Sequence, residues 1–240
     1  MIVAHVILAA MSMEEANPLY EGVAYALDVD KWQFIVYTDF ESMNRAVFVS
    51  IAPGLAVRAE YCIGAAEDHI GKYAIRLHMG YSEEEQRIVL RKCEIGTARE
   101  LKIRDIARLP IEQIIRSYHP PLWSYEITET GTNVFGPLPN WENEVLSKVD
   151  FPALRRQGPT PETLKWVSRI HSVTRLNKGP ATKRLTEVFD IPLRTASHWL
   201  TLMKERVPES ASAKLPSPIT VYDRTEPGID PGLPLKKLLE

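Results

Sequence analysis

The chain contains little cysteine: Cys62 and Cys93 are the two among 240 residues. Two cysteines are too few for a disulfide scaffold, and both lie in apolar, strand-like segments, which indicates a reduced intracellular protein. A membrane helix is not evident either. The opening apolar run, residues 2–11, is about half of the roughly 20 residues that span a bilayer, and it has no basic leader. We therefore predict a cytoplasmic protein with no membrane partner.

Recognisable catalytic and metal-binding motifs are also missing. The sequence has no glycine-rich phosphate loop and no Gly-x-Ser-x-Gly segment. A zinc set could be imagined from Cys62, His69, His78 and Cys93. No pair among them has the two-to-four-residue spacing of zinc ligands, and the acidic residues 83–85 fall in an expected turn, where water solvates them. We predict no metal, no cofactor and no enzymatic activity.

Net positive charge is absent as well, since 29 basic and 31 acidic residues give a net charge of −2. This average hides a segregation along the chain. Residues 1–150 carry a net charge of −8, whereas residues 151–207 contain 11 basic and 4 acidic residues, net +7. Residues 208–240 carry −1. A basic block confined in this way is typical of a module that binds a polyanion.

The first part of the chain has the patterns of an α+β domain. Alternation of apolar and polar residues predicts strands at 33–37, 55–61, 73–78 and 87–93, with residues 82–85 as a connection between the last two. The pattern becomes helical from Thr97, a possible cap, to Tyr118, with Pro110 restarting a helix. We predict a small antiparallel β-sheet with helices over residues 1–120, followed by a separate three-helix domain.

Proline and glycine punctuate the rest of the chain. Residues 121–158, which include Gly136 and Pro137, predict a linker packed by Trp123 and Trp141. The proline-rich residues 208–240 predict an extended, partly mobile tail. The segment between them, residues 159–207, has helical periodicity and contains most of the basic block.

Two helices are predicted in the first half of that segment. The first begins with Thr160 as cap and Pro161 and Glu162 in its first turn, and it stops at residues 177–180. Its apolar face is formed by Leu164, Val167, Ile170, His171 and Thr174. The second helix runs from Thr182, its expected cap, to Phe189, with Leu185, Val188 and Phe189 facing inward.

A turn at residues 190–192 leads to the third predicted helix, residues 193–206. Its buried positions are Ala196, Trp199, Leu200 and Met203. Three helices in this order, with a short turn between the second and third, are the helix-turn-helix geometry that places a helix in the major groove of DNA. The segment therefore predicts a domain that binds double-stranded DNA.

The expected DNA contacts lie on the second and third helices. Arg194 and His198 are four residues apart, so both can reach the same two or three base pairs. Thr182, Lys183, Arg184 and Thr195 suit phosphates. The full predicted set is Thr182, Lys183, Arg184, Leu193, Arg194, Thr195, Ser197, His198 and Thr201.

Residues 180–191 and 194–200 resemble the resolvase-like, homeodomain-like helix-turn-helix of many actinobacterial and phage proteins. That pattern has a proline and threonine, an alanine-rich helix, a turn, then Ser-Thr-Ala and Arg-Trp-Val. Residues 106–111 are similar to a Leu-Arg-x-Ile-Pro-Val stretch that often precedes it. Together the resemblance covers about half the chain. It implies a DNA-binding or regulatory role and no particular target.

The chain departs from this pattern at four positions. Asp190 replaces the turn glycine, Pro192 the capping serine, Leu193 a basic residue and His198 the arginine before tryptophan. These differences concern base reading more than the fold.

Three functions remain open at this stage. In the first, the protein is a transcriptional regulator whose acidic first domain dimerises or binds a ligand, because a lone helix-turn-helix contacts few base pairs. In the second, it is a DNA-processing accessory protein or an enzyme that uses the helix-turn-helix for targeting. In the third, it is a phage or mobile-element factor that uses the three helices for protein contacts, as Pro192 and Leu193 suggest.

Overall fold

A computed structural model describes residues 25–29, 32–38, 47–67, 73–97, 106–107, 109, 111–117, 120–138, 140–207, 214–223 and 233–239. These residues form a mixed α+β structure, the fold class that the sequence predicts. The chain divides into two units. Unit 1 comprises residues 1–46, 59–81 and 88–119, and unit 2 comprises residues 47–58, 82–87 and 120–240.

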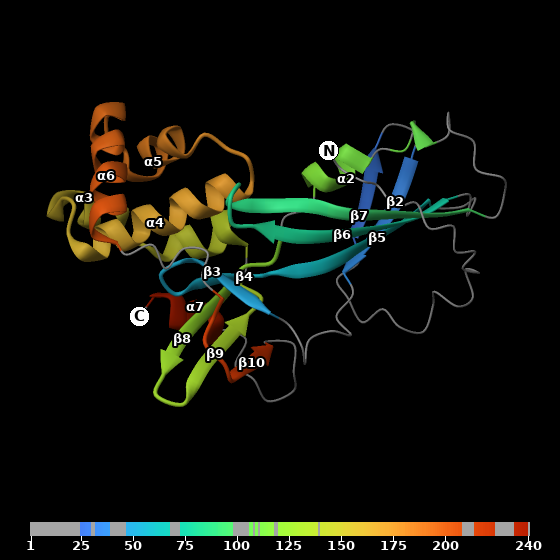
Figure 1. The fold of residues 1–240 in the computed structure, drawn as a ribbon. Coiled ribbons are helices and arrows are strands. Elements are labelled where there is room, and N and C mark those ends of the chain that lie inside the picture. Colours follow the sequence, from blue (N-terminus) through green and yellow to red (C-terminus); the bar gives the residue numbers. More distant parts are fainter. Residues whose placement is uncertain are drawn as a thin grey trace. The chain divides into compact units, whose positions relative to one another are not determined.

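Unit 1 contains a five-stranded sheet in the order β1-β2-β5-β6-β7. Its strands are β1 (Tyr25–Val29), β2 (Trp32–Thr38), β5 (Glu60–Glu67), β6 (Tyr73–Ser82) and β7 (Arg87–Thr97). The β1–β2, β2–β5 and β5–β6 pairs are antiparallel, and β5, β6 and β7 run side by side in Figure 1. The predicted strands at 33–37, 73–78 and 87–93 are confirmed, and the turn after β6 spans residues 83–86.

One face of this sheet is apolar because its side chains alternate. Tyr61 and Ile63 on β5 and Ile75, Leu77 and Met79 on β6 are all buried. The residues between them, such as Cys62, Arg76 and His78, are half-buried and lie on the opposite face.

The predicted strand at 55–61 is wrong as one element, because the chain changes sheets at Ala59. β4 (Leu55–Arg58) belongs to unit 2, and β5 begins at Glu60 in unit 1. All four side chains of β4 are buried, whereas those of β5 alternate from Glu60 to Ile63. Burial of consecutive residues marks a strand covered on both faces. Residues 47–58 are therefore not part of the predicted first domain.

The predicted helical segment from Thr97 is confirmed only near its end. Thr97 is the last residue of β7. Residues 98–105 lie outside the described residues. The helix that Pro110 was expected to restart is α2 (Ile111–Ser117), and Ile114 on it is fully buried.

Unit 2 contains a second five-stranded sheet, in the order β10-β9-β8-β4-β3. Its remaining strands are β3 (Phe48–Ala52), β8 (Trp123–Thr128), β9 (Gly131–Gly136) and β10 (Ile219–Asp223). Pairing is antiparallel except for β10, which runs parallel to β9. Phe48 on the edge strand β3 and Trp123 on β8 pack edge to face, with ring centroids 5.3 Å apart.

The predicted linker at 121–158 is wrong, because this segment forms regular structure. It contains β8, β9, the short helices η2 (Trp141–Val145) and η3 (Leu146–Lys148), and α3 (Phe151–Gln157). At Gly136, on β9, the ring of Trp123 fills the space that a side chain would need: a Cβ there would be 2.8 Å from Cε3 of Trp123. The expected packing of Trp123 and Trp141 is confirmed, since both are buried.

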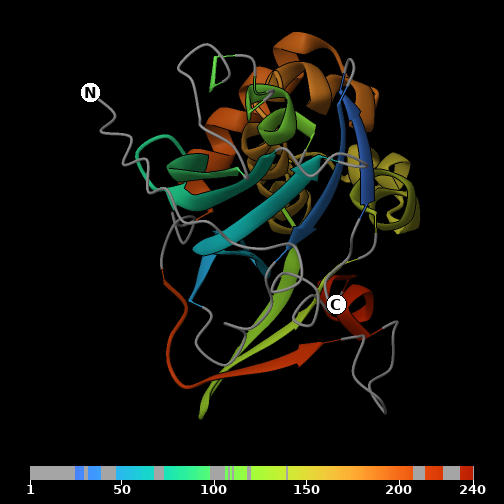
Figure 2. The same cartoon turned by 90° about the vertical axis from the view of Figure 1, so that its right-hand side faces the viewer.

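The predicted extended tail is also corrected. It contains β10 and a C-terminal helix, α7 (Leu233–Leu239), which contacts β8 and β9 in both views (Figures 1 and 2). Proline carbonyls in this segment accept hydrogen bonds although proline cannot donate. The Thr132 amide donates to the Pro218 carbonyl at 2.9 Å, and the Thr132 hydroxyl donates to the Pro216 carbonyl at 2.8 Å.

Three longer helices complete unit 2: α4 (Pro161–Leu176), α5 (Ala181–Phe189) and α6 (Leu193–Arg206). Each of the three contacts the other two, and α4 also contacts β3. Figure 1 shows them gathered with α3 at one end of this unit. We call α4, α5 and α6 the three-helix cluster.

Candidate nucleic-acid interface

The first helix of the cluster begins and ends as the sequence predicts. Thr160 is the N-cap of α4 and accepts a hydrogen bond from the Thr163 amide at 3.3 Å, with Pro161 at the first helical position. The helix ends at Leu176, before Gly179 and Pro180. Of its predicted apolar face, Leu164, Val167 and Ile170 are buried, whereas His171 and Thr174 are half-buried at its edge.

The second helix begins one residue earlier than predicted. Ala181 is its first residue and Pro180 its N-cap, so Thr182 lies in the first turn and is not the cap. Proline has a fixed φ and no amide, so it can precede a helix without leaving a donor unsatisfied. No side chain caps this helix start. Leu185 and Phe189 are buried as expected, and Val188 is half-buried.

The turn between α5 and α6 is held by a residue in the left-handed region. Asp190 has φ 51° and ψ 54°, where the related pattern has glycine. Aspartate is one of the few non-glycine residues that adopt this region readily. Arg155 of α3 donates to the Asp190 carbonyl at 2.9 Å and to its carboxylate at 2.5 Å. This role of Arg155 has no signal in the sequence, because the two residues are far apart in the chain.

The third helix, α6, has the predicted bounds. Ala196, Trp199 and Met203 are buried as expected. Leu200 is only half-buried, and Leu202 is buried in its place, because the buried face of α6 is turned slightly relative to the predicted one.

A line of aromatic rings forms the core beneath α6. Phe189 packs edge to face on Trp199 at 5.3 Å and on Phe151 at 5.0 Å, and Phe151 contacts Trp166 at 6.1 Å. Aromatic rings in this arrangement contribute beyond the area that they bury. The buried aromatic rings therefore set the orientation of α6, and none of them lies on its outward face.

The outward face of α6 contains most of the predicted base-reading residues. Its exposed residues are Leu193, Arg194, Ser197, His198, Thr201, Lys204, Glu205 and Arg206. All but Arg206 recur every three to four residues and so share one side of the helix, whereas Arg206, its last residue, lies in line with the buried face. Leu193 is 61% exposed. Thr195 is half-buried, and the Thr201 hydroxyl donates to the Ser197 carbonyl at 3.3 Å.

The predicted contacts on α5 differ from one another. Lys183 is exposed, and no ion pair joins it to another described residue. Arg184 forms ion pairs with Glu142 of η2 and with Glu187, so its charge is largely neutralised. Thr182 is half-buried.

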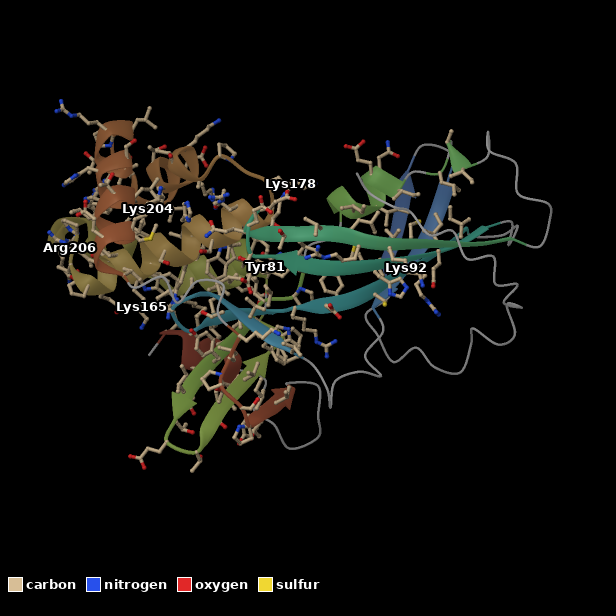
Figure 3. The ribbon with its side chains drawn as sticks, viewed as in Figure 1. Tyr81, Lys92, Lys165, Lys178, Lys204 and Arg206 are labelled. Atoms are coloured by element: carbon tan, nitrogen blue, oxygen red, sulfur yellow. The ribbon has the colours of Figure 1, made fainter. Side chains whose placement is uncertain are left out.

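Two exposed basic residues at the end of α6 were not predicted, and of these Lys204 extends the cationic outward face. Lys204 and Arg206 lie in the last turn of α6 (Figure 3). Both are exposed, and neither forms an ion pair with another described residue. Arg194 and Lys204 are ten positions apart, which corresponds to about 15 Å along a helix. The signal for them was the basic charge at the end of the predicted third helix.

Positive charge also affects His171 on α4. Burial, assisted by the nearby charges of Arg175 and Lys204, lowers the pKa of His171 to about 4. The imidazole is therefore neutral at pH 7 and adds no charge to the surface. This agrees with its prediction as a residue at the edge of the core.

A buried arginine connects the cluster to the sheet of unit 2. Arg169 on α4 is 2% exposed, its Nε donates to the Pro53 carbonyl at 2.9 Å, and its guanidinium lies 4.5 Å from the ring centroid of Trp166. Burial lowers the pKa of Arg169 to about 10, so it is still charged at neutral pH. Gly54, at φ 71°, lets the β3–β4 turn approach the guanidinium.

Comparison of the chain with family models, with curated proteins and with solved structures finds no match. The described residues contain no group of three His, Cys, Asp or Glu side chains placed to hold a metal ion. Within the same part of the chain, no helix has both the length and the apolar character to cross a membrane. Function must therefore be inferred from the shape and charge of the cluster.

Proposed function

We propose that this is a cytoplasmic protein that binds double-stranded DNA, in the role of a transcriptional regulator, with α6 in the major groove. The observation that carries the proposal is the outward face of α6. Arg194, Ser197 and His198 are all exposed on a helix whose other side is fixed by a buried aromatic core. A rigid, exposed helix with short polar and cationic side chains fits a groove about 12 Å wide.

Base reading is assigned to the first half of α6. Arg194 suits the O6 and N7 acceptors of guanine, which its guanidinium can engage with two hydrogen bonds. His198 lies one turn further along the same face and reaches a neighbouring base pair. Leu193 can contact a thymine methyl group, because apolar side chains provide that contact.

Phosphate contacts are assigned to the two helix starts and to Lys183. The N-cap residues of α5 and α6 are Pro180 and Pro192, whose side chains accept no hydrogen bond, so the first amides of both helices are not bonded by a cap side chain. Such amides, with the positive end of the helix dipole, bind phosphate well. Arg184 is expected to contribute less than Lys183, because it must first leave Glu142 and Glu187.

Unit 1 is proposed to join two copies of the chain. One helix in the groove reads only a few base pairs, and a symmetric dimer doubles that number. Light scattering coupled to size exclusion would report twice the 27.2 kDa mass of the chain. A monomer at micromolar concentration, with or without DNA, would remove this part of the proposal.

The first test is the salt dependence of binding to a labelled random-sequence duplex, measured by fluorescence anisotropy. For about three phosphate contacts, the affinity should fall roughly 40-fold between 50 and 200 mM salt. Lys183→Ala should lower both the affinity and the salt slope. Lys236→Ala is the matched control, because Lys236 is an exposed lysine on α7, outside the cluster, and it should change neither.

The second test is selection of bound sequences from a random duplex pool. Wild type should enrich a defined motif containing guanine, and Arg194→Ala should lose preference at one or two positions, at a cost of about 1–3 kcal/mol. Arg194→Lys keeps the charge and loses the paired hydrogen bonds, so it should retain affinity and lose the same preference. Unchanged selection by both variants would show that Arg194 does not read bases.

A second candidate function is favoured by Leu193, the large exposed apolar side chain at the start of α6. A protein partner that covered the start of α6 would bury this side chain. In this case the cluster would bind another protein in a phage or mobile-element assembly. A flat salt response, with Leu193→Asp abolishing partner binding, would favour this function over DNA binding.

A role in DNA processing is tested separately with supercoiled DNA. The proposal assigns no chemical step to the three-helix cluster, so incubation should produce neither cleaved nor joined product. Any strand cleavage that a second preparation reproduces would make the protein an enzyme.

A further inference from the structure

A cysteine, a histidine and a glutamate lie together on three neighbouring strands of unit 1. Cys62 on β5 is directly opposite His78 on β6, and the Cys62 Sγ is 3.2 Å from the His78 Nδ1. On the other side of the ring, the His78 Nε2 is 3.3 Å from the Glu94 Oε2 on β7. All three side chains are half-buried on the polar face of the sheet.

We propose that Cys62 is a reactive thiol, with His78 as its base and Glu94 as a positioning residue, that forms mixed disulfides with small anionic disulfides. The arrangement is that of an activated nucleophile: a thiol, a base within hydrogen-bond reach, and a third group that orients the base. The site is distinct from the proposed DNA interface, which belongs to unit 2.

His78 can accept the thiol proton because its two ring nitrogens face different partners. Glu94 attracts the proton of the neutral ring to Nε2, which leaves the Nδ1 lone pair directed at Cys62. The Nε2–Oε2 contact is off the direct line of a hydrogen bond, so Glu94 acts on the ring chiefly through its charge. The same charge stabilises the imidazolium that forms when the thiol is deprotonated.

Glu94 keeps its charge at neutral pH. A hydrogen bond from Lys92 at 2.6 Å is the largest cause that lowers the pKa of Glu94, and His78 lowers it further. Arg76 on β6 lies 3.9 Å from the same carboxylate. Besides His78, the described charged groups on this face of the sheet include Glu60 on β5, Arg76 on β6, and Lys92 and Glu94 on β7, and the side chain of Arg91 on β7 lies over Gly80 on the same face.

This geometry suits a nucleophile and does not suit a metal site. Cys62 and Glu94 contact opposite nitrogens of the His78 ring, so they cannot bind one ion together with it. Two cations lie beside the site, Arg76 and Lys92, and Figure 3 labels Lys92. Their charge favours a negatively charged reagent.

The chemical step is a thiol–disulfide exchange. His78 takes the proton of Cys62, and the thiolate attacks one sulfur of the small disulfide. The S–S bond of the reagent breaks as the new S–S bond to Cys62 forms, and the second half of the reagent leaves as a thiolate. No external oxidant is needed beyond the disulfide itself.

The second cysteine provides an internal control. Cys93 lies next to Glu94 on β7, and successive side chains of a strand point to opposite faces. Burial first, and then the charge of Glu94, raise the pKa of Cys93. It should therefore react slowly at neutral pH.

The test measures the reaction of the full chain with dithiobis(nitrobenzoate), a dianionic aromatic disulfide. Cys93→Ser leaves Cys62 as the reacting thiol, and Cys62→Ser leaves Cys93. At pH 7 the first variant should react at least about tenfold faster than the second, because an ordinary thiol is only a few per cent ionised there. Equal rates, or a faster Cys93, would overturn the proposal.

Variants of the supporting residues, made in the Cys93→Ser background, separate activation from exposure. His78→Gln should slow the reaction at pH 7 about tenfold and make the rate rise with pH as that of an ordinary thiol does, near 8.5. Glu94→Gln should shift the midpoint of the pH profile toward higher pH, with the rate at high pH unchanged. A merely structural role of Glu94 would leave that midpoint in place.

Two further measurements make the result decisive. Arg76→Gln should slow the reaction with the anionic disulfide but not the reaction with the neutral reagent iodoacetamide. If His78→Gln fails to fold by circular dichroism, the pH profile of the Cys93→Ser protein decides. A single rise near pH 8.5 there would show an ordinary thiol and overturn the proposal, whereas substantial reaction below pH 7 would support it.

Discussion

The three-helix cluster and the sheet of unit 2 are assembled in opposite ways. The cluster is built from one continuous stretch, residues 161–206, in which each helix contacts the next along the chain. The sheet takes its strands from three separate regions, residues 48–58, 123–136 and 219–223. The cluster depends on local helical periodicity, whereas the sheet depends on pairing between distant segments. Substitutions in the two regions should therefore have different effects on stability and binding.

The largest expected effect is in the core of the cluster. Phe189→Ala removes a ring that is 1% exposed and packs on both Phe151 and Trp199. It should lower the free energy of unfolding by about 3–5 kcal/mol, measured by urea denaturation. Val188→Ala, at a half-buried neighbour, should cost much less. Similar losses for both would mean that the aromatic line does not organise the cluster.

The next effect tests whether the tail supports the sheet. Leu238 on α7 is fully buried, and α7 contacts β8 and β9. Leu238→Ala should cost roughly 2–4 kcal/mol, whereas the neighbouring Leu239→Ala, at a 38% exposed position, should cost little. Denaturation followed by circular dichroism would compare them. A negligible effect at Leu238 would return the C-terminal segment to the role of an extended tail.

The third effect is a pH dependence of stability that arises in the cluster, from His171 on α4. The pKa of His171 is lowered to about 4 in the folded protein, so the unfolded chain, with a pKa near 6.5, binds the proton more readily. Stability is fully present above about pH 6.5 and is lost as the pH falls toward 4. After allowance for the exposed part of the ring, the loss at pH 4 is on the order of 2 kcal/mol. His171→Asn should remove this part of the pH dependence, measured by thermal unfolding between pH 4 and 8.

The smallest effect concerns the turn between α5 and α6. Arg155→Ala removes an exposed ion pair to Asp190 and should cost less than about 1 kcal/mol. Because the turn sets the angle of α6, DNA affinity should fall more than stability does. Asp190→Gly should leave stability nearly unchanged, since glycine also adopts the left-handed region. A loss of stability with full DNA affinity would contradict the assigned role of Arg155.

The cluster was predictable because its signals are local. Thr160 and Pro161 mark the start of α4, and the spacing of Ala196, Trp199 and Met203 marks the buried face of α6. The errors there are small: Thr182 is not a cap, and Leu202 is buried in place of Leu200. Both errors arise because tertiary packing displaces a helix start or a buried face by one or two residues. The periodic pattern of the sequence does not locate either feature that closely.

The sheet of unit 2 was not predictable in the same way. Gly136 and Pro137 favoured a linker, but Gly136 provides the space for the Trp123 ring, which a local pattern cannot show. The change of sheets at Ala59 leaves only a faint signal, the run of apolar residues before it. The Cys62–His78–Glu94 site was missed because its three members are brought together by strand pairing rather than by spacing.

The amino-acid sequence alone determined the mixed α+β composition, the segregation of charge and the positions of α4, α5 and α6, because helix periodicity, caps and charge act over a few neighbouring residues. Tertiary structure decided which strands share a sheet, where the C-terminal segment packs, which basic residues are neutralised by ion pairs and which thiol meets a histidine. These features depend on contacts between residues far apart in the chain, whose free energies arise only when the whole fold brings them together.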